Sequence, residues 1–130
     1  MKLLCTKFNL KGEIIMSHVQ HLTVIVTGWN KELLNQAKEK AIELFTENMV
    51  TNTAKSLINQ YESFMVCSSG SKGGWEEDTE HKQKIEKYVK YLDSKAFSEK
   101  KHDNSLQYVV LSYGDSGSKV EKTNQIKKFN

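Results

Sequence analysis

The feature that most constrains the fold is the regular alternation of β-type runs with amphipathic helical segments. Residues 21–27 are rich in valine, isoleucine and threonine and end at Gly28, which is typical of a buried strand. From Lys31 to about Asn48 the apolar residues recur three or four positions apart, which predicts a helix with Asn30 as its N-cap. These apolar positions are Leu34, Ala37, Ala41, Leu44 and Phe45.

The alternation continues in the middle of the chain. Residues 61–68 predict a second strand, and residues 76–94 predict a second amphipathic helix. Residues 49–56 fit a loop, an edge strand or a short helical turn, and residues 97–104 form a polar connector. The apolar face of the second helix consists of Ile85, Tyr88, Val89 and Leu92.

The last part of the chain completes the predicted sheet. Residues 106–113 predict a third strand, and after a turn at 114–117 we expect residues 119–123 to pair back as a fourth. The expected fold is therefore α+β, a two-layer sandwich with a mixed sheet of about four strands and both helices on one face. Residues 16–124 are expected to form one domain and residues 125–130 a tail. The residues expected to face the sheet are Leu34, Ala41, Phe45, Ile85, Val89 and Leu92.

The first fifteen residues have two interpretations. Residues 11–13, Lys-Gly-Glu, can be encoded by AAA-GGA-GAA, which contains a bacterial ribosome-binding sequence at a suitable distance before Met16. Residues 1–15 are then a translated leader that does not belong to the native protein. The alternative is an ordinary flexible N-terminal arm.

Composition excludes several classes of protein. All 19 basic residues are lysines and the net charge is only +3, so a nucleic-acid partner is not expected. No apolar run approaches the roughly 20 residues of a membrane span, so no membrane partner is expected. Two cysteines, Cys5 and Cys67, give no disulfide framework, which favours a cytoplasmic location. The absence of arginine and proline is typical of an AT-rich genome, such as that of a low-GC bacterium or its phage.

The residues that usually carry catalysis or bind metals form no recognisable constellation. The four histidines, His18, His21, His81 and His102, are scattered, whereas a structural zinc site needs about four convergent ligands. Cys67 lies in the second predicted strand and is expected to be a small core residue, with a spatial pairing to His21 or His81 left open. We therefore predict no catalytic residue, no metal and no cofactor, and an enzyme is not the favoured interpretation.

A glycine-rich loop, Ser68–Gly74, lies between a predicted strand and a predicted helix. Glycines in this position let backbone amides approach a phosphate. The helix then opens with Glu76, Glu77 and Asp78, which would repel an anion. A flexible loop before an acidic helix start is therefore favoured over a phosphate site.

Aromatic residues follow three of the predicted strands. If these strands are parallel, Trp29, Trp75 and Tyr113 gather at one edge of the sheet, where open α/β sheets bind ligands. Alternatively, the tryptophans fill the ends of the core. The candidate ligand or partner surface is Trp29, Ser69, Gly70, Ser71, Lys72, Gly73, Gly74, Trp75, Tyr113 and Asp115.

Three segments resemble small phage and prophage proteins. Residues 61–66 match their tyrosine-x-serine-phenylalanine-x-valine strand, residues 70–75 their glycine-serine-lysine-x-glycine-tryptophan loop, and residues 113–115 their tyrosine-glycine-aspartate. The chain departs from the family at Ser69, where the pattern has an acidic residue. The resemblance implies a phage or mobile-element origin and no known activity.

Three functions are consistent with these observations. A non-enzymatic accessory or interaction protein, with a protein partner or a second copy of the chain, is favoured because no catalytic set is found. A small-molecule or phosphate-binding protein, or an enzyme that uses the loop and the aromatic residues, is the alternative. A weak nucleic-acid binder comes third.

Overall fold

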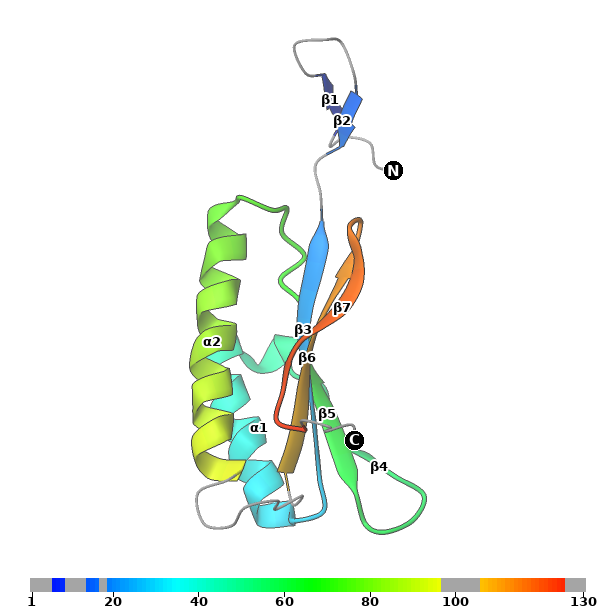
Figure 1. The fold of residues 1–130 in the computed structure, drawn as a ribbon. Coiled ribbons are helices and arrows are strands. Elements are labelled where there is room, and N and C mark those ends of the chain that lie inside the picture. Colours follow the sequence, from blue (N-terminus) through cyan, green and yellow to red (C-terminus); the bar gives the residue numbers. More distant parts are fainter. Residues whose placement is uncertain (1–5, 9–13, 17–18, 97–105, 126–130) are drawn as a thin grey trace.

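Two helices cover one face of a five-stranded antiparallel sheet (Figure 1). The structure is a computed structural model, and it describes residues 6–8, 14–16, 19–96 and 106–125. The strand order is β4-β5-β3-β6-β7, and each strand is antiparallel to its neighbours. In chain order these elements are β3 (Gln20–Gly28), α1 (Lys31–Phe45), the 3₁₀ helix η1 (Glu47–Met49), β4 (Ala54–Lys55), β5 (Glu62–Val66), α2 (Glu76–Ala96), β6 (Leu106–Gly114) and β7 (Gly117–Thr123).

Helix α1 begins where the sequence predicts and ends three residues earlier. Asn30 is extended, and its side-chain oxygen accepts hydrogen bonds from the amides of Glu32 and Leu33, both at 3.1 Å. These bonds satisfy two of the amides that a helix start leaves unpaired. At the other end Thr46 has a φ of 79°, which is outside the helical region, so the helix stops at Phe45.

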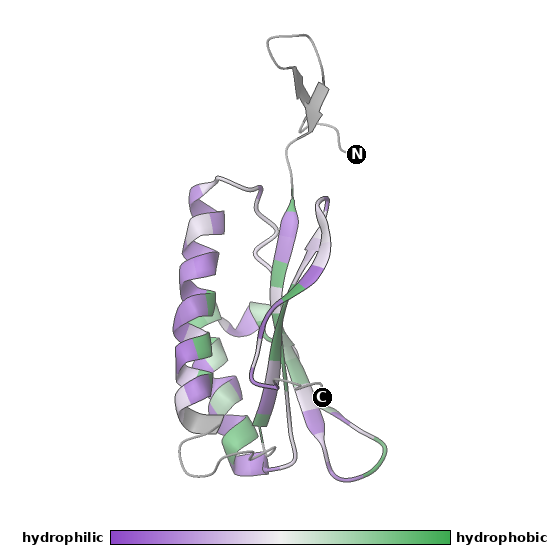
Figure 2. Cartoon of the chain, viewed as in Figure 1, coloured by the Kyte–Doolittle hydropathy of each residue, from purple (hydrophilic) through white to green (hydrophobic). Residues whose placement is uncertain are grey.

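The core lies between the helices and the sheet, and its centre is aromatic. Phe45 of α1 lies edge-on to Tyr88 and to His81 of α2, with ring centroids 5.8 and 5.6 Å apart. The Tyr88 hydroxyl donates a hydrogen bond to the carbonyl of Ala37 at 2.6 Å, which joins the two helices. Figure 2 shows that α2 is mostly hydrophilic along its length, while apolar residues concentrate in α1 and the central strands. The predicted core residues Leu34, Ala41, Phe45, Ile85, Val89 and Leu92 are all buried, which confirms the expected helix faces.

The α+β class, the two-layer arrangement and the order of the main elements agree with the sequence prediction. Two details differ, because the sheet has five strands instead of about four and is antiparallel instead of mixed. The additional strand comes from residues 49–56, which the sequence left open. Val50 forms a β-bridge with Val66, and further along the same segment β4 pairs with β5.

A separate two-stranded sheet precedes β3. It consists of β1 (Thr6–Phe8) and β2 (Ile14–Met16), which pair antiparallel with Thr6 opposite Met16. Whether residues 1–15 are a translated leader stays a prediction. The connector at 97–104 and residues 126–130 of the expected tail lie outside the described residues.

Candidate functional site

The direction of each strand decides which of the predicted surface residues come together. Strand β3 lies between β5 and β6, and both run antiparallel to it. The C-terminal ends of β5 and β6 therefore point toward the same end of the sheet, where β3 begins. At that end, Gly114 of β6 is opposite Gln20, the first residue of β3. The loop after β5 and the turn after β6 therefore share one end of the sheet, which we call the loop end.

Trp29 lies at the opposite end of the sheet. It follows Gly28, and the nine residues of β3 separate the two ends by roughly 26 Å at about 3.3 Å per residue. The expected gathering of Trp29 with Trp75 and Tyr113 therefore does not occur, because the three strands are not parallel. The alternative, in which the tryptophans fill the ends of the core, is also wrong, since Trp29 is 48% and Trp75 50% exposed.

His21 contacts both Tyr113 and the segment that follows β5. The His21 ring lies 5.1 Å from the Tyr113 ring, and its Nδ1 atom is 2.7 Å from the Ser68 hydroxyl oxygen. The loop end thus brings together two of the segments that the sequence assigned to the candidate surface. His21, which makes both contacts, is not among the residues of the predicted surface.

Within the loop, the half-buried Lys72 and the exposed Trp75 form a cation–π pair. The Lys72 ammonium lies 5.2 Å from the Trp75 ring centroid, and the Trp75 amide donates to the Lys72 carbonyl at 3.1 Å. Ser71, in contrast, is buried, and its hydroxyl lies 2.8 Å from that of Ser69. The loop therefore turns Ser71 inward and presents Trp75 to the solvent, with Lys72 half-buried beside it.

Asp115 has a structural role at the loop end. Its carboxylate accepts a hydrogen bond from the Val19 amide at 3.0 Å, and its own amide donates to the Val19 carbonyl at 3.1 Å. Gln20 adds two bonds to the same turn, donating to the Gly117 carbonyl at 2.8 Å and accepting from the Ser116 amide at 2.9 Å. These contacts fasten the β6–β7 turn to the start of β3.

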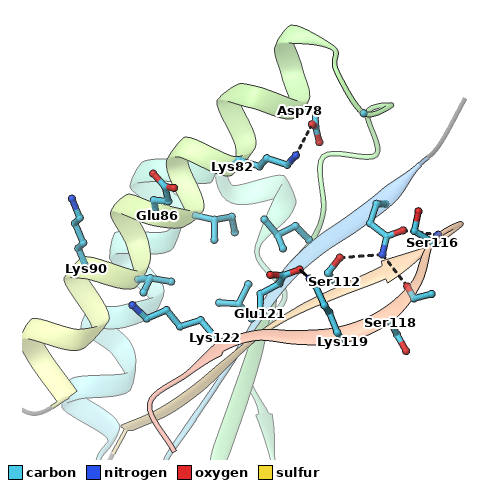
Figure 3. A pocket seen from close by; sticks show the side chains of 17 residues that line it. Asp78, Lys82, Glu86, Lys90, Ser112, Ser116, Ser118, Lys119, Glu121 and Lys122 are labelled. Carbon is cyan, nitrogen blue, oxygen red and sulfur yellow. Dashed lines mark hydrogen bonds and ion pairs between the residues drawn. The ribbon is translucent and has the colours of Figure 1, made fainter. Parts of the chain in front are cut away.

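A groove of about 990 Å³ runs between α2 and the β6–β7 hairpin (Figure 3). Gly73 lines it, whereas Gly70 and Gly74 have positive φ angles and open space around them. The rim carries both charge signs, and Lys82 pairs with Asp78 at 3.1 Å. Because several of its lysines pair with carboxylates, the groove presents little free positive charge to an anion. Its apolar floor consists of Leu22, Ile85, Val89 and Val110.

His81 is a buried structural residue. Its Nε2–H donates to the carbonyl of Leu22 at 2.9 Å, on the part of β3 that extends beyond its pairing with β5. Burial lowers the pKa of His81, although the bond to Leu22 and the charge of Asp78 act in the opposite direction. The ring is therefore neutral near pH 7 and serves as a hydrogen-bond donor.

Cys67 lies one residue beyond β5 instead of inside a strand, and it is a half-buried free thiol. Its amide bonds to the Met49 carbonyl at 2.8 Å, past the end of the β3–β5 ladder. In the described part of the chain, no three histidine, cysteine or acidic side chains are grouped so that they could hold a metal ion. Cys5, His18 and His102 lie outside the described residues.

The face of the sheet away from the helices has a cluster of apolar side chains among uncharged polar ones such as Thr23 and Thr27. Met65, Ile25 and Val109 lie in one row across β5, β3 and β6, and Leu111 is opposite Val120 in the next. Both helices lie on the other face (Figure 1), and these side chains are partly exposed, with Val120 56% and Tyr113 42% accessible. We call this set the outer face: Ile25, Met65, Val109, Leu111, Tyr113 and Val120.

The outer face is missing from the surface predicted above, although the sequence contains a signal for it. Residues 24–26 and 108–111 are continuous apolar runs, whereas a strand with one solvated face alternates apolar and polar residues. Continuous runs predict burial on both faces. Two helices on the same side of the sheet supply a cover for one face only.

Comparison of the chain with protein-family models, curated proteins and solved structures finds no match. No helix among the described residues combines the length and the apolar character needed to cross a membrane. The functional interpretation therefore rests on the geometry of the molecule itself.

Proposed function

We propose that this protein is a small non-enzymatic interaction protein that binds a protein partner through its outer face. The observation that carries the proposal is the row of partly exposed apolar side chains, Met65, Ile25 and Val109, on a sheet face that neither helix covers. Contiguous apolar surface of this kind marks interaction sites on soluble domains.

The distribution of charge supports the same function. Charged residues make up 27% of the chain, but the outward positions of β3, β5 and β6 contain no lysine, aspartate or glutamate. Depletion of charge together with apolar and aromatic side chains is the composition of the core of a protein interface. Full burial of one such side chain stabilises by about 1.5–3 kcal/mol relative to full exposure. Because these side chains are only partly buried in the free chain, binding of a partner gains the remaining part of this energy.

The resemblance to phage and prophage proteins supports a phage or mobile-element origin in a low-GC host. The two cysteines, which provide no disulfide framework, support a cytoplasmic location. Sequencing of the neighbouring genes tests the origin. Flanking phage genes support it, and a neighbourhood of housekeeping genes contradicts it.

Site-specific photo-crosslinking in the native host tests the proposed surface. A photoreactive residue at Val120 is expected to give adducts with another polypeptide, because this side chain is on the outer face and 56% exposed. The matched control is Leu57, which is 98% exposed in the loop between β4 and β5. A probe at Val120 that yields only the unlinked chain, or no more adduct than the probe at Leu57, refutes the proposal.

Binding of a small ligand or phosphate is the second candidate, and the Lys72–Trp75 pair favours it. Trp75 of this pair is exposed, Lys72 is half-buried, and Gly73 between them lines the groove. A ligand at about a hundred times its Kd adds roughly 2.7 kcal/mol of stability, which a thermal-shift screen with nucleotides and inorganic phosphate detects. This candidate predicts a shift that the double variant Lys72→Ala, Trp75→Ala loses, and no shift with any compound contradicts it.

A further inference from the structure

We infer that the partner of the outer face is a second copy of this chain, so that two sheets pack face to face in a symmetric dimer. This inference rests on the function proposed above and names its partner. It predicts four layers, with the two sheets inside and a pair of helices on each outer side. Two packed sheets of this type lie about 10 Å apart.

The neutrality of the outer face is the first reason for a second copy. A two-fold axis brings the same patch of both subunits together, so a patch with a net charge meets a patch of the same sign. The outward residues of β3 and β6 are polar or apolar but carry no lysine, aspartate or glutamate, although the chain contains 19 basic and 16 acidic residues. A surface for a charged partner is normally of opposite charge to it, whereas this surface suits a copy of itself.

The edges of the sheet provide the second reason, because they disfavour the other way in which two sheets associate. Strand β7 forms one edge and has charged residues at Lys119, Glu121 and Lys122. Strand β4 forms the other edge and is only two residues long. Charged and very short edge strands are devices against edge-to-edge pairing. Association through the sheet is therefore directed to its face.

The size of the face suits a reversible dimer. Strands β3, β5, β6 and β7 have nine, five, nine and seven residues, which at about 3.3 Å per residue and about 4.8 Å between strands cover about 480 Å² in plan, before side-chain relief is counted. An interface of standard size buries about 800 Å² on each partner, and smaller interfaces are typical of transient complexes. The described strands alone provide more than half of the standard area, and Tyr113 adds an exposed aromatic ring at the end of the face.

Analytical ultracentrifugation of the purified full chain tests this inference. The expected result is a dimer at about 100 μM that dissociates on dilution, since interfaces at the small end of the size range form reversible complexes. Val120→Lys places two like charges in the interface and is expected to weaken the dimer by about 100-fold or more. Leu57→Lys is the matched control and leaves the dimer unchanged, because Leu57 lies outside the outer face.

A second charge at the same position tests the face again. Val120→Glu is expected to weaken the dimer as Val120→Lys does, because either substitution buries an unpaired charge in the interface. Since Val120 is 56% exposed, neither substitution disturbs the fold, which circular dichroism and a urea transition verify. Leu111→Lys gives a second, independent variant on β6.

The outcomes separate this inference from the proposed function. A wild-type monomer at about 100 μM overturns the dimer, as does a dimer that dissociates with Leu57→Lys and not with Val120→Lys. If the chain is monomeric while the Val120 probe links to a different host protein, the proposed function stands and the inferred dimer is wrong. A monomer with no adduct in the host refutes both.

Discussion

Replacing Phe45 with alanine is expected to remove a large part of the stability of the domain. Phe45 is 1% exposed, and its ring lies edge-on to both Tyr88 and His81, at 5.8 and 5.6 Å between centroids. Truncation of a buried phenylalanine costs about 3–5 kcal/mol, from the lost transfer free energy and from the cavity left behind. Domains are stable by about 5–15 kcal/mol, so the variant lies close to the unfolding threshold.

A second variant divides this cost into its parts. Phe45→Leu keeps most of the apolar volume and loses the two edge-to-face contacts, each worth about 0.5–1.5 kcal/mol beyond burial. We therefore expect Phe45→Leu to cost roughly 1–3 kcal/mol. Leu57→Ala is the control and is expected to stay within about 0.5 kcal/mol of the wild type, since Leu57 is 98% exposed.

Urea unfolding followed by circular dichroism measures these differences. With a denaturant slope of about 2 kcal/mol/M, Phe45→Ala lowers the midpoint by about 2 M while the slope stays constant. A midpoint for Phe45→Ala within about 0.3 M of the Leu57→Ala control refutes the reasoning. It would show that α1 does not turn this ring into the core.

Two further predictions concern His81 and Gly114. Burial holds the pKa of His81 in the folded chain below its ordinary value of 6.5. Between this lowered pKa and 6.5 the unfolded chain binds more protons than the folded chain. The free energy of unfolding therefore falls as the pH decreases through this range. His81→Gln keeps a donor for the Leu22 carbonyl and is expected to reduce the loss of stability between about pH 7.5 and 5.5; an identical loss in urea titrations of both proteins contradicts this. Gly114→Ala puts a Cβ 2.4 Å from the Val19 carbonyl oxygen and is expected to reduce the free energy of unfolding by roughly 2–4 kcal/mol. Gly70→Ala is the control, where the space is open, and is expected to cost about 1–2 kcal/mol. Equal melting temperatures of the two variants contradict the clash.

The sequence predicts the helices well because their periodicity is a local property. The apolar spacing from Leu34 to Phe45 selects one face of α1, and Asn30 marks its start, as the structure confirms. The end of α1 is less accurate because Thr46 adopts a positive φ that no local residue pattern signals. Strands β3 and β6 are also predicted within a residue, since their continuous apolar runs have clear boundaries.

The error in the candidate surface follows from one short segment. After α1 the chain runs along the sheet through residues 50–55, and the Thr51 amide and side chain both bond to the Met65 backbone, at 2.9 and 2.8 Å. The chain then reverses, so β5 runs antiparallel to β3. Residues 50–55 are therefore the first arm of a hairpin, and their sequence, which fits a loop as well as an edge strand, does not reveal it.

The same reversal explains which candidate residues come together. Because β5 and β6 are both antiparallel to β3, the segment after β5 reaches the loop end, where His21 contacts both Ser68 and Tyr113, and Trp29 remains at the far end. A surface assigned from chain order alone depends on strand direction, which tertiary pairing determines. The outer face does not depend on direction, since side chains alternate between the faces of a strand whichever way it runs. A continuous apolar run such as residues 108–111, which makes both faces of a strand apolar, is thus a better sequence signal for an interaction surface in this fold than the position of residues after strands.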